Sequence, residues 1–271
     1  MQPENEFFIG WQKEMPSGFR KMSRNALAVF FVITLTASGI LPYFHTRYDT
    51  GKYELNKITS LTGTLHLKPA PVLEYATGKD STGSLQYESV LLVSPGKFGA
   101  EKFLDKYPGL SSMNNKTIRI NGHRINAHGH RVFELNQLTV IDSIYSDNLS
   151  IEPIVPLGKV QLKGEIADPK CLLGVMNPGE GKAHRDCAIR CLSGGITPVF
   201  HVQDGRGDHE YYLIVDKEGK PVQNQILPYV ADQVELCGDL SKWGSWYLLS
   251  PEPQSIRRLN AYHLPDVTWC K

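Results

Sequence analysis

The sequence predicts a mainly β protein, with an N-terminal transmembrane helix followed by two tandem small barrels, the second of which has a helical insertion. Three observations indicate this architecture. Residues 26–44 contain no charged side chain, the rest of the chain consists of short apolar runs bounded by glycine and proline, and two sets of these runs follow the same order. We expect a cytoplasmic segment at 1–25, a first barrel at 57–148, a second at 156–260 and a C-terminal tail at 261–271.

The composition is that of an ordinary globular protein, with 41% hydrophobic and 21% charged residues. The 29 lysines and arginines are balanced by 28 acidic residues, and no long basic run appears. Because a nucleic-acid partner normally requires a concentrated basic surface, we expect no nucleic acid as a partner. Five cysteines are an odd number, so at least one stays unpaired if all pairing is internal.

The apolar run at 26–44 is about as long as a helix needs to cross the hydrocarbon layer of a membrane. Positively charged flanks remain in the cytoplasm, so we expect the body after Tyr48 to lie outside it. A cleaved signal peptide is disfavoured by the long basic lead-in, and a buried core helix by the lack of a polar face. Four basic residues precede the run: Lys13, Arg20, Lys21 and Arg24.

The two sets of apolar runs read as two similar β modules. The first opens with LTGTL at 61–65 and the second with LKGEI at 162–166. Alternating apolar side chains at 117–121 and 233–237 are typical of half-buried strands, in which successive residues face opposite sides. Glycines suit the bulges where a strand curls around a small barrel. About five short strands in this order look like the OB-fold, a small closed Greek-key barrel.

Most of the chemistry in the sequence lies in the stretch GEIADPKC and the glycine-rich loop and helix predicted after it. Residues 183–192 are good helix formers, with a glycine where the helix should end. On such a helix His184, Cys187 and Cys191 fall on one face, since each residue turns by about 100°. Cys171, which ends GEIADPKC, meets them if the helix folds back on the sheet.

Four interpretations of this cluster stay open. Thiols close together outside the cytoplasm oxidise, so a disulfide from Cys171 to Cys187 or Cys191 is one. A zinc or copper site is the second: three thiolates and His184 form a tetrahedral zinc set, and Met176 would add a soft donor for copper. A redox-active thiol is disfavoured by the lack of CxxC, and ordinary buried thiols are the fourth. An imidazole directed at the sulfurs would favour the metal, and one in solvent the disulfide.

The cysteine–histidine segment resembles an uncharacterised group of bacterial exported, membrane-anchored proteins that carry GEIxDxKC followed by HxxCAxxC. The likeness covers mainly Gly164 to Gly195, and it extends weakly across both modules. It implies export and an OB-like module, and it implies no activity or cofactor. Together with the charge flanking the helix, it places the protein in the cell inner membrane as a single-pass protein, with its C-terminal body on the periplasmic side.

We expect a membrane-anchored extracytoplasmic binding or accessory module, held in the membrane by 26–44 and with membrane or envelope proteins as partners. A metal-binding or redox protein using Cys3His is the alternative, and a thiol-dependent enzyme is the second alternative. No nucleotide-binding or hydrolase motif appears, so we nominate no catalytic residue and expect a protein that is not an enzyme. His123, His128 and His130 read as a polar hairpin tip in solvent.

Overall fold

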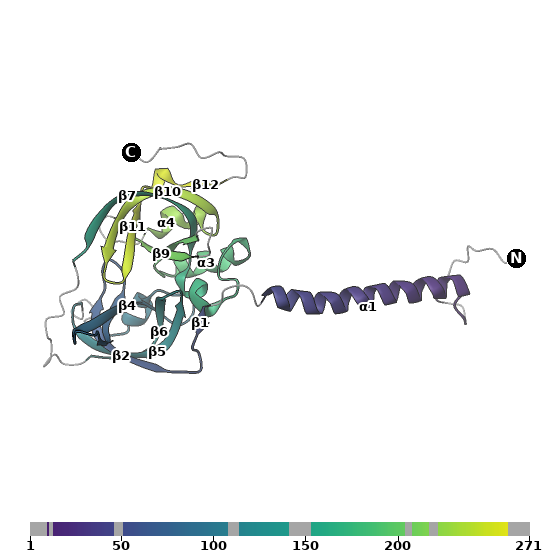
Figure 1. The fold of residues 1–271 in the computed structure, drawn as a ribbon, viewed down its shortest axis with the longest axis horizontal. Coiled ribbons are helices and arrows are strands. Elements are labelled where there is room, and N and C mark those ends of the chain that lie inside the picture. The colour runs from purple at the N-terminus through teal and green to yellow at the C-terminus, as the bar shows by residue number, and fades with distance from the viewer. Residues whose placement is uncertain are drawn as a thin grey trace. The chain divides into compact units, whose positions relative to one another are not determined.

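The computed structural model describes residues 10, 13–45, 51–107, 114–140, 153–203, 208–216 and 222–259. The chain divides into two compact units, Met1–Asp49 and Thr50–Lys271, which we describe separately. The first unit contains the helix α1, Ser17–His45, and the second contains all the strands (Figure 1). The predicted C-terminal tail at 261–271 lies outside the described residues.

Helix α1 confirms the prediction of a long apolar N-terminal helix and extends it back to Ser17. Its apolar stretch has a mean hydropathy of 2.0 and is long enough to cross a membrane, a property that it shares with signal sequences. The hydroxyls of Thr34, Thr36 and Ser38 donate to backbone carbonyls within the helix. These polar groups therefore need no water, which suits them to an apolar environment.

The first barrel is closed by five strands and carries one short extra strand. Strands β2, β3 and β4 pair in sequence order and antiparallel, β4 pairs with β6 in parallel, and β5 closes the barrel between β6 and β2. Strand β1 adds to the edge of β5, and helix α2 lies between β4 and β5 in the chain. The bounds are β1 Lys52–Tyr53, β2 Thr59–His66, β3 Val72–Lys79, β4 Leu85–Val93, α2 Ala100–Leu104, β5 Thr117–Ala127 and β6 His130–Val140.

The five closing strands of the second barrel repeat this topology, while its extra strand follows the barrel in the chain instead of preceding it. Strands β7, β8 and β9 pair in order, β9 pairs with β11 in parallel, β10 closes the barrel between β11 and β7, and β12 adds to β10. The same order in both barrels confirms two tandem OB-like barrels. The bounds are β7 Val155–Ala167, β8 Val199–Gln203, β9 His209–Ile214, α4 Gln223–Ile226, η4 Leu227–Tyr229, β10 Gln233–Trp243, β11 Trp246–Pro251, η5 Pro253–Ser255 and β12 Arg257–Arg258.

Equivalent glycines show how closely the two barrels correspond. A Cβ on Gly63 would lie 2.0 Å from the carbonyl oxygen of Glu74, and one on Gly164 would lie 2.2 Å from that of His201. Each contacted residue pairs with the residue after the glycine, in the second strand of its barrel. Only glycine allows this close approach of two backbones, which bends the first strand into the barrel wall.

The second barrel differs by an insertion between its first two strands. The predicted helix at 183–192 is confirmed as α3, Arg185–Ser193, and two short turns precede it, η2 at Cys171–Val175 and η3 at Lys182–His184. The helix ends where the Gly194 N–H donates to the carbonyls of Arg190 and Cys191. The insertion therefore leaves β7 at its end and returns to β8 after one full helix.

We predict that Gly63→Ala destabilises the fold by about 1–3 kcal/mol, because the added methyl group overpacks a backbone contact. Gly164→Ala should behave alike. The control is Gly78→Ala, since nothing lies within 4 Å of a Cβ there, and its effect should be much smaller. Urea unfolding of the full chain in detergent, followed by circular dichroism, measures the difference. Equal losses for Gly63→Ala and Gly78→Ala would contradict the role of the close approach.

Candidate metal site

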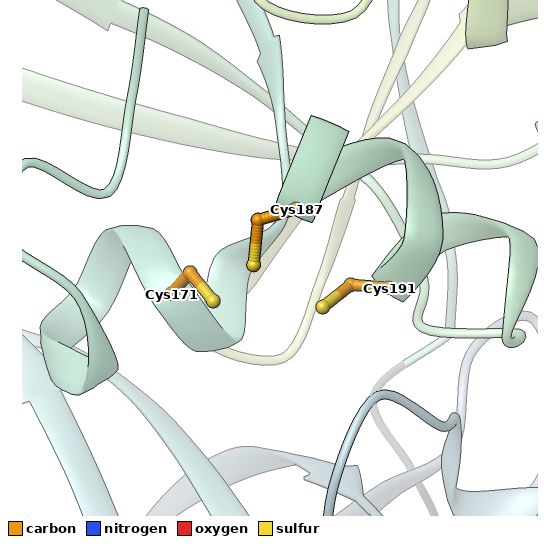
Figure 2. A group of neighbouring side chains, drawn as sticks. All are labelled: Cys171, Cys187 and Cys191. Atoms are coloured by element: carbon orange, nitrogen blue, oxygen red, sulfur yellow. The ribbon is translucent and has the colours of Figure 1, made fainter. Parts of the chain in front are cut away.

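The insertion brings three cysteines of the sequence prediction together. The Sγ atoms of Cys171, Cys187 and Cys191 all lie within 4.8 Å of one another. Figure 2 shows the three side chains facing a common space between η2, which carries Cys171, and α3, which carries the other two. Cys171 and Cys191 are buried and Cys187 is partly exposed. All three are free thiols, so the disulfide among them that the sequence allowed is not formed.

A second group of donors overlaps the first at Cys171. Donor atoms of Asp168, Cys171 and His184 also lie within 4.8 Å of one another. Asp168 is 0% exposed and His184 is 4% exposed. Among the residues that the structure describes, His184 Nε2 and Asp168 Oδ2 have no hydrogen-bond partner. A buried polar atom without a partner costs about 1–3 kcal/mol, and a bound ion would remove that cost.

Asp168 is the site residue that sequence reasoning missed. Its Oδ1 accepts a hydrogen bond of 2.9 Å from the backbone N–H of Lys170, and its carbonyl accepts one from Leu172. These bonds turn the chain directly after β7, which brings an acid three residues before Cys171 onto the same side as the thiol. The usable signal was the acid within GEIADPKC, since carboxylates commonly ligate metals or orient a ligating imidazole.

The electrostatic surroundings favour neutral groups when no metal is bound. A hydrogen bond with Cys191, burial and the nearby carboxylate of Asp168 all raise the pKa of Cys171. Burial lowers the pKa of His184, so its imidazole is neutral at pH 7 and able to ligate a metal. A raised pKa leaves little thiolate at Cys171, which argues against a reactive nucleophile at this position.

Met176 and Lys97 lie at the edge of the cluster. Met176, the soft donor considered for copper, is 47% exposed, and its backbone N–H donates to the carbonyl of Cys171 at 3.2 Å. The ammonium of Lys97, from the first barrel, donates to Cys187 Sγ at 3.0 Å. This hydrogen bond raises the pKa of Lys97, which keeps the side chain cationic beside the sulfurs.

The predicted solvent-exposed histidine hairpin is correct only in part: His128 and Gly129 are exposed, whereas His130 is partly buried. The ring of His128 stacks on His209 of the second barrel with centroids 4.0 Å apart. His130 contacts Tyr211 and Trp246 with centroids 4.9 Å and 5.0 Å apart. Burial, with the nearby positive charge of Lys242, lowers the pKa of His130 to about 4. The imidazoles of His128 and His130 therefore form part of the contact between the two barrels.

Comparisons with known proteins identify no family. No protein-family model matches the chain, and a search of curated proteins gives no match. A solved structure of a deletion variant of the single-stranded DNA binding protein from Thermus aquaticus is similar, at 13% identity over 78% of this chain and 97% of that chain, with a TM-score of 0.20. A likeness at this TM-score carries no argument about function, and the OB-like assignment depends on the strand pairing above.

The exclusion of nucleic acid as a partner is nevertheless corrected. The solved structure to which the chain is similar is that of a single-stranded DNA binding protein, whereas the charge balance led us to exclude nucleic acid. The physical reason is that a net charge sums over the whole chain and does not show how the charges are distributed over a surface.

We predict that zinc binding at pH 7 releases a proton from Cys171, because its raised pKa keeps the thiol protonated until the metal displaces the proton. Calorimetric zinc titrations of the full chain, in buffers of different ionisation enthalpy, count the protons released. Cys171→Ser should release about one proton fewer than the wild type. An unchanged count would mean that Cys171 is not a ligand or is already a thiolate.

Proposed function

We propose that this protein is a membrane-anchored extracytoplasmic accessory module that binds one zinc ion through Cys171, His184, Cys187 and Cys191. One observation carries the proposal: three free thiols converge on one point, and the buried imidazole of His184 lies beside Cys171, one of the three. A disulfide would use two of the thiols and leave the imidazole unsatisfied. A tetrahedral ion with three sulfur ligands and one nitrogen ligand uses all four donors.

Zinc fits this donor set better than copper. Imidazole and thiolate together form an ordinary zinc set, whereas copper(I) favours sulfur ligands, including thioethers. The only thioether considered, that of Met176, is 47% exposed. A carboxylate oxygen of Asp168 lies within 4.8 Å of an imidazole nitrogen of His184, and carboxylates orient many ligating histidines.

The arrangement supports a structural ion. Four protein donors fill a tetrahedral zinc, and a catalytic zinc keeps one position open for water or substrate. Cys171, His184 and Cys191 are buried, which keeps the ion away from bulk water. The ion would hold the insertion in place, and the module would act through binding.

The position of the body outside the cytoplasm is part of the proposal. It is supported by the apolar helix α1 and by the basic residues around its first turns, including Arg20, Lys21 and Arg24. The resemblance of the cysteine–histidine segment to exported bacterial proteins supports the periplasmic side of the inner membrane. Zinc bound to the thiols would protect them from oxidation in such a compartment.

Metal analysis tests the zinc site directly. Full-length protein purified in detergent without added metal should contain about one zinc per chain, and Cys187→Ser or His184→Ala should lower this content at least tenfold. The control Met176→Leu should keep the zinc. A thiol reagent should label Cys187, the partly exposed cysteine, faster after a chelator has been added. Metal-free protein with three reactive thiols, or with a disulfide among them, would contradict the proposal.

Protease protection tests the membrane topology. In spheroplasts, protease added from outside should digest the body, since it follows α1 on the proposed outer side. An epitope tag at the N-terminus should remain protected until the membrane is opened by detergent. Protection of the body in intact spheroplasts would contradict the proposed orientation.

A further inference from the structure

We propose that the zinc site also holds the two barrels together. All of its ligands belong to the second barrel, and the ammonium of Lys97, from the first barrel, offsets its net negative charge. Metal binding and barrel docking are then thermodynamically coupled. This inference rests on the proposed function, because it requires that an ion is bound.

Each cysteine stands beside a contact with the first barrel. Cys187 accepts a hydrogen bond of 3.0 Å from Lys97 Nζ, in the turn between β4 and α2. Cys191 lies in the last turn of α3, and directly after that helix Gly194 accepts a 3.0 Å hydrogen bond from the N–H of Gly99 in the same turn. A Cβ on Gly194 would lie 1.9 Å from the carbonyl oxygen of Lys97, so the two backbones meet with no room for a side chain.

The third cysteine is adjacent to a buried lysine that inserts into the first barrel. Lys170, next to Cys171, is 4% exposed. Its ammonium donates to the carbonyls of Ser94 and Gly96 at 3.0 Å and 2.7 Å, and it pairs with Glu134 of β6. A lysine is stable at such a position only while these partners surround it, so the position of the backbone at Cys171 depends on the first barrel.

The net charge of the zinc-bound site explains why the ammonium of Lys97 lies beside Cys187. A zinc ion with three thiolates and a neutral imidazole carries one net negative charge, which is costly in a largely buried site. The ammonium of Lys97 beside Cys187 Sγ offsets this charge only while the barrels are docked. Because coupling between two equilibria is reciprocal, a contact that strengthens zinc binding in the docked state makes zinc strengthen the docking by the same factor.

The test uses the full chain in detergent with zinc alone as the ligand. Lys97→Met removes the charge, and the matched control Lys97→Arg retains it. Competition with a fluorescent chelator should give about tenfold weaker zinc binding for Lys97→Met, as is usual for outer-shell residues, and little change for Lys97→Arg. The side chain of Lys97 is exposed, so neither variant disturbs the core.

Hydrogen exchange measures the effect of zinc on the contact between the two barrels. Removing zinc should accelerate exchange of the Gly99 amide, which donates across the barrels to Gly194. Amides between β3 and β4, inside the first barrel, should keep their protection.

Wild-type protein that binds zinc, with Lys97→Met unchanged in affinity or with Gly99 unaffected by chelation, would overturn the coupling and leave the proposed function intact. Wild-type protein without zinc would remove both.

Discussion

The apolar core that the two barrels share is the constraint on which the rest of the structure depends. Leu91 and Val132 of the first barrel pack with Leu173 and Trp246 of the second in one continuous cluster. Cys171 and Cys191 belong to the same cluster, so the insertion is packed from the moment it leaves β7. Because protein interiors are close-packed, the turns and the helix of the insertion have little freedom to rearrange. The polar donors carried by these elements are consequently held together.

The same packing buries polar side chains, and the properties of the site depend on whether these side chains find partners. Lys170 finds carbonyl and carboxylate partners across the barrel contact, which satisfies its charge. Asp168 Oδ2 and His184 Nε2 find none among the described residues. Five other buried polar atoms of the described residues also lack a partner, so the feature that sets this group apart is its position beside Cys171, where three thiols converge. The proposed zinc ion would take the imidazole and the three thiols as ligands, with the carboxylate of Asp168 beside the imidazole.

The histidine contact shows where sequence reasoning on polarity fails. Imidazoles are both polar and flat, so a hairpin rich in histidine suits either water or an aromatic surface. His128 stacks on His209, which is paired in turn with His201 through a nitrogen–nitrogen contact of 2.8 Å. The choice between water and protein depends on the neighbouring barrel, and no residue within the hairpin specifies that neighbour.

The sequence by itself determined the elements whose signal is local. The apolar length of α1 and the alternation in β5 follow from the periods of helix and strand, and the glycines of β2 and β7 mark where these strands bend. The alternation expected at 233–237 is not realised, because β10 buries residues 234–238 on both of its faces. The proximity of Cys187 and Cys191 follows from their spacing on one helix, whereas His184 lies in the turn before that helix.

Only the tertiary structure decided the role of Asp168 and the approach of Lys97, which lies 90 residues before Cys187. The physical reason is that a side-chain contact between distant residues depends on how the two barrels pack, and packing is a property of the whole core that no local period encodes.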